Sequence, residues 1–134
     1  MSDKKWRWVS EDAVLAIYEQ QHTHQDGAAG IRDHSLLLSA LAAPQRLAAN
    51  GNPDVAELAA SYAAGIARNR VFLNGNMRTA LIVAAGVFLP LNGYQLAASD
   101  EETATVMRSV AAGSMTDEEL AAWFLRNIRP LPAE

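Results

Sequence analysis

Apolar residues recur along most of the chain at the three- and four-residue spacing of an amphipathic helix, and strand-like alternation is nearly absent. Alanine dominates from residue 40 onward, and leucine and isoleucine follow it, which adds intrinsic helix propensity to the pattern. No linker, internal repeat or low-complexity block interrupts it. We therefore predict an all-α fold, a compact bundle of about six helices, with residues 1–134 forming one domain.

Capping residues place the first two helices. Ser10, followed by two acidic residues that suit the positive first turn, predicts a helix that ends near His22. Asp33 is the expected cap of a second helix, with an apolar run over residues 35–43. We expect this helix to stop at Pro44, because proline lacks the N–H that a continuing helix needs.

The middle of the chain predicts two more helices. Asn52 followed by Pro53 is a typical cap-then-proline start, and this helix carries an apolar stripe to about Asn69. A polar break over residues 74–76 then precedes a very apolar helix over residues 79–89, which we expect the next proline to end. Since this helix is apolar on every side, we expect it in the centre of the bundle.

Two capping-box patterns open the last two helices. Ser99 with Glu102 starts a helix that closes at Gly113, and Thr116 with Glu119 starts the final one. The last six residues contain two prolines, so we expect them to fray.

Composition excludes several classes of protein. The 134 residues are 50% hydrophobic and contain no cysteine, so a disulfide scaffold and a cysteine-based zinc site are excluded. The net charge of −4 gives no overall attraction to a nucleic-acid backbone, and we expect no nucleic-acid partner. No apolar run reaches membrane-spanning length and no secretion signal is visible, so we expect a cytoplasmic protein with no membrane partner.

The stretch RVFLNGNMRTA, residues 70–80, carries the candidate chemistry. A tight polar loop enters a helix N-terminus here, where unsatisfied N–H groups favour an anion and Gly75 lets the backbone approach a phosphate. Arg78 adds a planar set of donors, while the amides of Asn74 and Asn76 suit holding the loop or a metal-bound water. The alternative is a solvated loop whose asparagines cap a helix.

This stretch resembles the signature of the Fic/Doc superfamily, whose death-on-curing (Doc) branch reads His-x-Phe-x-Asp/Asn-Gly/Ala-Asn-Lys-Arg-Thr-Ala. The matching positions are Phe72, Gly75, Asn76, Arg78, Thr79 and Ala80. Residues 27–45 resemble the family's upstream Gly-x-Arg-Asp and leucine-rich helix, and residues 88–96 resemble its Phe-Leu-x-x-Asn-Gly-Tyr block. The blocks follow in the family's order, and the resemblance covers about residues 10–126, which we expect to form the core.

The resemblance implies a Fic/Doc-like helical bundle that acts as the toxin of a bacterial type II toxin–antitoxin pair. Its implied reaction uses ATP and Mg²⁺ to phosphorylate a threonine hydroxyl of elongation factor Tu, which blocks translation. Adenylyl transfer, the reaction of Fic-type members, is the alternative. Met77 stands where the Fic signature has glycine and the Doc signature has lysine, so its bulk favours the Doc branch.

Residue roles carry over from the resemblance. The implied phosphate-binding set is Asn74, Gly75, Asn76, Met77, Arg78 and Thr79. Asn76 and Arg78 also take catalytic positions, Arg70 occupies the position of the family's histidine, and Asn74 is a weak candidate magnesium ligand. Phe72 is a structural residue, as are Arg32 and Asp33, which form an ion pair or a helix cap.

Three departures from the signature predict an attenuated or inactive site. Arg70 cannot be deprotonated, so it cannot replace the histidine as general base. Asn74 offers a magnesium ion no charge, and Met77 lacks the lysine's charge. Arg70 is either an inactivating substitution in a lethal toxin or the result of natural drift. A noncatalytic Fic-fold binding module is therefore a further alternative, in which Arg68 and Arg70 join Arg78 as an anion clamp.

The chain contains no Ser/Thr-x-x-x-Glu-Gly/Asn string, the inhibitory helix of self-restrained Fic enzymes. The resemblance therefore implies restraint by a partner, a Phd-like antitoxin whose disordered segment folds into a helix in an apolar groove. The three tryptophans and the alanine- and leucine-rich helix faces are candidates for that groove.

Overall fold

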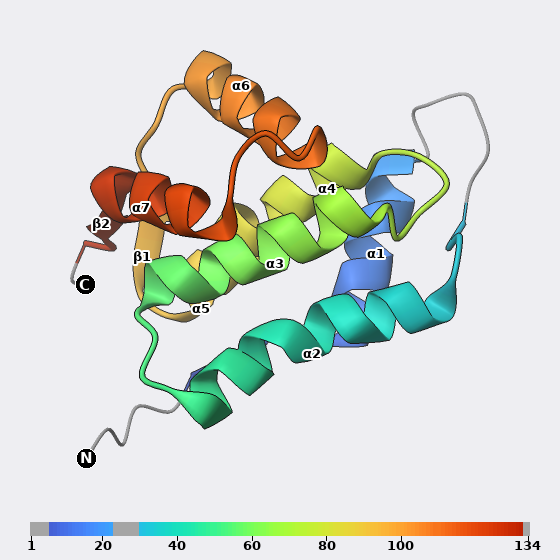
Figure 1. The fold of residues 1–134 in the computed structure, drawn as a ribbon, viewed down its shortest axis with the longest axis horizontal. Helices are drawn as coiled ribbons and strands as arrows, with labels where there is room; N and C mark the ends of the chain where they lie inside the picture. The colour runs from blue at the N-terminus through green and yellow to red at the C-terminus, as the bar shows by residue number, and fades with distance from the viewer. Residues whose placement is uncertain (1–5, 23–29, 133–134) are drawn as a thin grey trace.

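Side-chain caps start five of the helices in the computed structural model, which describes residues 6–22 and 30–132. Figure 1 shows their arrangement. The helices are α1 (Glu11–His22), α2 (His34–Asn50), α3 (Val55–Asn69), α4 (Asn76–Leu81), the π-helix η1 (Ile82–Phe88), α5 (Leu89–Leu91), α6 (Asp100–Ala111) and α7 (Asp117–Asn127). Because α4, η1 and α5 follow one another without a break, the described residues form six helical stretches, which confirms the predicted all-α bundle. The expectation of one domain over residues 1–134 stays a prediction.

The predicted caps form in three places. The hydroxyl of Ser10 accepts a hydrogen bond from the Ala13 N–H at 3.1 Å, and Asp33 accepts from the Ser35 N–H. Thr116 and Glu119 form a reciprocal capping box at the start of α7.

Two cap predictions need correction. The cap of α3 is Asp54, in a capping box with Glu57, and not Asn52, because Asp54 is the residue whose carboxylate reaches the third N–H of the helix. Ser99 caps α6 through the Glu102 N–H, but the box does not close. The Glu102 carboxylate instead accepts a hydrogen bond from Trp123 Nε1 at 2.6 Å.

The two proline boundaries were wrong. Helix α2 continues through Pro44 to Asn50, with Pro44 itself buried inside the helix. Packing compensates for the missing N–H, since α2 lies so close to α3 that a Cβ added at Gly65 would meet the Ala40 Cβ at 3.3 Å. The apolar helix begins at Asn76, and the chain remains helical past Pro90 to Leu91, so Pro90 lies inside the continuous stretch formed by α4, η1 and α5.

The centre of the bundle is α3, and not the apolar helix over residues 79–89. Ten of the 15 residues of α3 are buried, and it contacts α2, α4, α6, α7 and η1. Its alanines let neighbouring helices approach from several sides. Figure 1 shows α3 running through the middle of the molecule, with α2 along one side and α6 and α7 on the other.

The chain end is more ordered than its prolines suggested. Strand β2 (Ile128–Pro130) pairs antiparallel with β1 (Tyr94–Leu96), with Leu96 opposite Ile128. The fraying prediction is therefore wrong for residues 129 and 130, because pairing with β1 and the burial of the neighbouring Ile128 hold this segment.

The tryptophans pack against the core, Trp6 and Trp8 as half-buried residues and Trp123 as a buried one. Trp6 and Trp8 lie against the buried ring of Phe88, with ring centroids 6.5 and 6.2 Å away, and Trp123 is 4% exposed. The part of the chain that the structure describes has no helix long and apolar enough to span a bilayer.

Candidate functional site

The candidate site is a short loop between α3 and α4. Helix α3 ends at Asn69, and Arg70 adopts the left-handed conformation, with φ 52° and ψ 59°. Val71 and Phe72 are then buried, and Gly75, with φ 74°, turns the chain into α4. Glycine adopts this left-handed conformation without steric cost, and it leaves the backbone of the turn uncovered.

Asn76 closes this loop on itself. Its Oδ1 accepts a hydrogen bond from the Phe72 N–H at 2.8 Å, and its Nδ2 donates to the Phe72 carbonyl oxygen at 2.9 Å. Both ends of the amide therefore hold backbone. Of the two uses that the sequence suggested for this amide, the structure shows it holding the loop.

Arg32 attaches the loop to the chain that leads into α2. Its Nε and Nη2 donate to the carbonyl oxygens of Arg70 and Asn69, each at 2.8 Å. Its backbone N–H donates to the Val71 carbonyl at 2.9 Å. Arg32 thus satisfies carbonyls that the end of α3 leaves unpaired.

Asp33 serves as the cap of α2, which resolves the alternatives of ion pair and helix cap. Its carboxylate accepts hydrogen bonds from the Ser35 hydroxyl at 2.6 Å and from the Ser35 N–H at 2.9 Å. These two hydrogen bonds hold the pKa of Asp33 below its usual value, and the bond from the Ser35 hydroxyl has the larger effect.

Tyr18, from α1, supports the loop in a way that sequence reasoning missed. Its ring stacks on Phe72, with centroids 4.0 Å apart and planes 6° from parallel. Its hydroxyl accepts a hydrogen bond from the Gly30 N–H at 2.9 Å. The available signal was only its place on the apolar side of α1, which did not distinguish it from other core residues.

A cavity of about 460 Å³ opens between the first turn of α4 and the face of α6 that packs on it. Its lining residues are Gly75, Asn76, Met77, Arg78, Leu81, Ala104, Met107 and Arg108. The predicted residues Asn74 and Thr79 are not part of that lining. Thr79 is fully buried, and within the described residues its hydroxyl has no hydrogen-bond partner. The α6 residues are a component that sequence reasoning missed.

The Fic/DOC family model matches residues 8–88, more than half of the chain and all of the loop. The chain belongs to the Fic/DOC family. This Fic/DOC chain is also 37% identical over 100 residues to a protein named Toxin Doc from Mycolicibacterium smegmatis (strain ATCC 700084 / mc(2)155). That alignment covers 72% of the chain and 76% of the relative. The resemblance to the Doc branch is therefore confirmed.

The anion clamp predicted from Arg68, Arg70 and Arg78 does not form, because the three side chains do not meet at the cavity. Arg68 donates to the Asp117 carboxylate at 2.7 Å and to the Met115 carbonyl at 3.0 Å, so its guanidinium joins α3 to the start of α7. Arg70 is exposed and does not line the cavity. Only Arg78 of the three arginines borders the cavity.

The donor set of this Fic/DOC site does not match a resident magnesium ion. Mg²⁺ is usually held by one or two carboxylates together with substrate phosphates. No carboxylate lines the cavity among residues 6–22 and 30–132, and Asn74, which is half-buried, offers a neutral amide. These residues also contain no group of three or more acidic, histidine or cysteine side chains suited to a metal. Among the described residues that line the cavity, Arg78 and Arg108 are the charged side chains available to a bound phosphate.

Proposed function

We propose that this Fic/DOC chain is a Doc-type toxin, built to bind ATP at the α4–α6 cavity and to phosphorylate a threonine hydroxyl of elongation factor Tu, with the transfer attenuated or abolished by Arg70. The observation that carries the proposal is the folded signature loop, with Gly75 and Arg78 bordering a cavity of about 460 Å³. The relative named Toxin Doc supports the toxin role. Action on elongation factor Tu would place the protein in the cytoplasm.

The chemistry of phosphoryl transfer suits what the cavity offers. The transition state is loose, so catalysis depends mainly on positioning and on stabilising charge on the phosphoryl oxygens. The planar guanidinium of Arg78 matches phosphate oxygens in a bidentate way. Gly75 leaves its backbone accessible to the same phosphates.

Arg70 sets the expected level of activity. It cannot accept the proton of the target hydroxyl, and a positioned general base contributes about 10²–10⁴-fold. Met77, 40% exposed and uncharged, adds no attraction for phosphate. We therefore expect ATP binding with weak or undetectable phosphate transfer.

The decisive experiment restores a base at position 70. Arg70→His should raise the transfer of label from γ-labelled ATP to elongation factor Tu by about 10²–10⁴-fold. Histidine is among the residues that tolerate the left-handed conformation found there, so the loop should keep its shape. Arg70→Ala is the matched control, because it removes the same guanidinium and supplies no base. An Arg70→His protein that binds ATP and transfers nothing would contradict the kinase proposal.

The position of the label separates the competing functions. Transfer from α-labelled ATP by Arg70→His would indicate adenylyl transfer. The exposed and permanently charged Arg70 favours a second candidate, a noncatalytic Fic-fold binding module. If the protein is such a binding module, the unaltered protein and Arg70→His should both bind the nucleotide, and neither should transfer label to elongation factor Tu.

We also propose a Phd-like antitoxin as the partner that restrains this toxin. A peptide from the disordered C-terminal segment of such an antitoxin should gain helical circular dichroism when it is titrated with the protein, as coupled folding and binding requires. No gain in helix at saturating peptide would count against this partner.

A further inference from the structure

We propose that Arg108, on α6, is a second phosphate contact of the α4–α6 cavity, so that the cavity ranks nucleotides by their number of phosphate groups. The inference rests on the proposed nucleotide binding and deepens it. It assigns a role to a residue beyond the segment that matches the Fic/DOC family, which ends at residue 88.

One face of α6 forms the wall of the cavity opposite α4. Met107 and Arg108 follow Ala104 by three and four residues, so each is a neighbour of Ala104 on the helix surface, and all three line the cavity. Met107 is 3% exposed, which makes it a fixed part of this wall, whereas the short side chain of Ala104 leaves room. Figure 1 shows α6 lying over α4, as their contacts require.

Arg108 carries a charge that no acidic partner neutralises in the described parts of the chain. Its one hydrogen bond there is from Nη2 to the Thr105 hydroxyl at 3.2 Å, and it forms no ion pair with those residues. Arg78 brings a second guanidinium from α4, and the described lining contains no carboxylate. In a chain of net charge −4, the cavity is therefore a local concentration of positive charge that favours a multiply charged anion.

The rest of the lining narrows the class of anion. Met77, Leu81 and Met107 form an apolar part of the lining, which suits a flat nucleobase. A volume of about 460 Å³ lies within the range of small-molecule sites. One cavity with two arginines and an apolar side thus fits a nucleoside that carries several phosphates better than it fits a free phosphate.

The test is isothermal titration of the full chain with ATP, ADP and AMP, in the presence of magnesium chloride. Arg108→Ala should weaken ATP binding about tenfold and AMP binding less than about twofold, because a charge-assisted hydrogen bond contributes roughly one factor of ten. Arg108→Lys should recover part of the loss, since it restores the charge without the planar fork.

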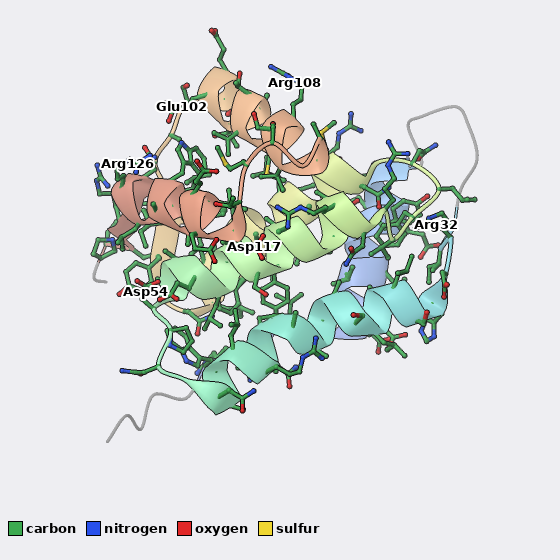
Figure 2. All side chains as sticks on the ribbon, in the orientation of Figure 1. Arg32, Asp54, Glu102, Arg108, Asp117 and Arg126 are labelled. Atoms are coloured by element: carbon green, nitrogen blue, oxygen red, sulfur yellow. The ribbon has the colours of Figure 1, made fainter. Side chains whose placement is uncertain are left out.

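Arg126→Ala is the matched control. It removes the same charge from an exposed position on α7, and Figure 2 shows Arg126 well apart from Arg108. We expect it to bind all three nucleotides as the unaltered protein does. Far-ultraviolet circular dichroism should show the same fold for each variant.

The outcomes separate the two proposals. If the unaltered protein binds ATP and Arg108→Ala keeps the same ratio of ATP to AMP affinity, the role of Arg108 is refuted while nucleotide binding stands. If the unaltered protein binds none of the three nucleotides at millimolar concentration, the proposed function fails and the role of Arg108 fails with it.

Discussion

Replacement of Arg70 by glycine should stabilise this protein. Arg70 is the one non-glycine residue with positive φ in the described parts of the chain, and a side chain in the left-handed conformation costs roughly 1–2 kcal/mol. Glycine removes that cost but loses about 0.5–1 kcal/mol through its greater freedom in the unfolded chain. The Arg70 side chain is exposed and makes no hydrogen bond or ion pair with described residues, so its removal sacrifices no such contact. The net gain should lie between about 0 and 1.5 kcal/mol, with a central value of about 0.75 kcal/mol.

Urea denaturation followed by tryptophan fluorescence measures this gain. Arg70→Ala is the control, because alanine removes the guanidinium but still bears the cost of the left-handed conformation. We expect Arg70→Gly to unfold at higher urea than both Arg70→Ala and the unaltered protein, with an unchanged dependence of the unfolding free energy on urea. Equal midpoints for the glycine and alanine variants would refute the strain argument at position 70.

Three further predictions concern contacts away from the cavity. Arg32→Ala removes two hydrogen bonds of 2.8 Å and should lower the free energy of unfolding by roughly 1–3 kcal/mol in urea, with partial recovery in Arg32→Lys; no loss would show that water replaces these bonds. Tyr62→Phe leaves the buried Val9 N–H without its acceptor and should cost about 1–3 kcal/mol. Burial raises the pKa of Tyr62, so stability from this group is complete below the unfolded pKa of about 10 and is lost as pH rises through the folded pKa. Tyr62→Phe should therefore flatten the alkaline decline in the melting temperature, and an unchanged slope above about pH 10 would contradict this assignment. The exposed Arg68–Asp117 ion pair should contribute less than about 1 kcal/mol to the free energy of unfolding. A double-mutant cycle measures this coupling, and about 1 M salt should screen it toward zero.

Most of the fold predictions that the structure confirms depend on contacts between residues close together in the sequence. Caps such as Ser10, Asp33 and Thr116 satisfy N–H groups within three residues of themselves, so their partners lie within the same short segment of sequence. The signature loop was identified in the same way, from residue types at fixed spacing between positions 70 and 80. These features depend on neighbours along the chain, and a sequence pattern contains those neighbours.

Contacts between distant segments were beyond that reasoning. Helix α2 passes through Pro44 because it packs on α3, and residues 128–130 form a strand because β1 lies beside them. Arg68 was a candidate for the anion clamp until Asp117, 49 positions away, placed its charge elsewhere. The wall formed by α6, with Arg108, faces the loop only after the bundle has assembled. The free energy of such contacts depends on which helices and strands pack against each other, and a sequence pattern does not specify which distant segments do so.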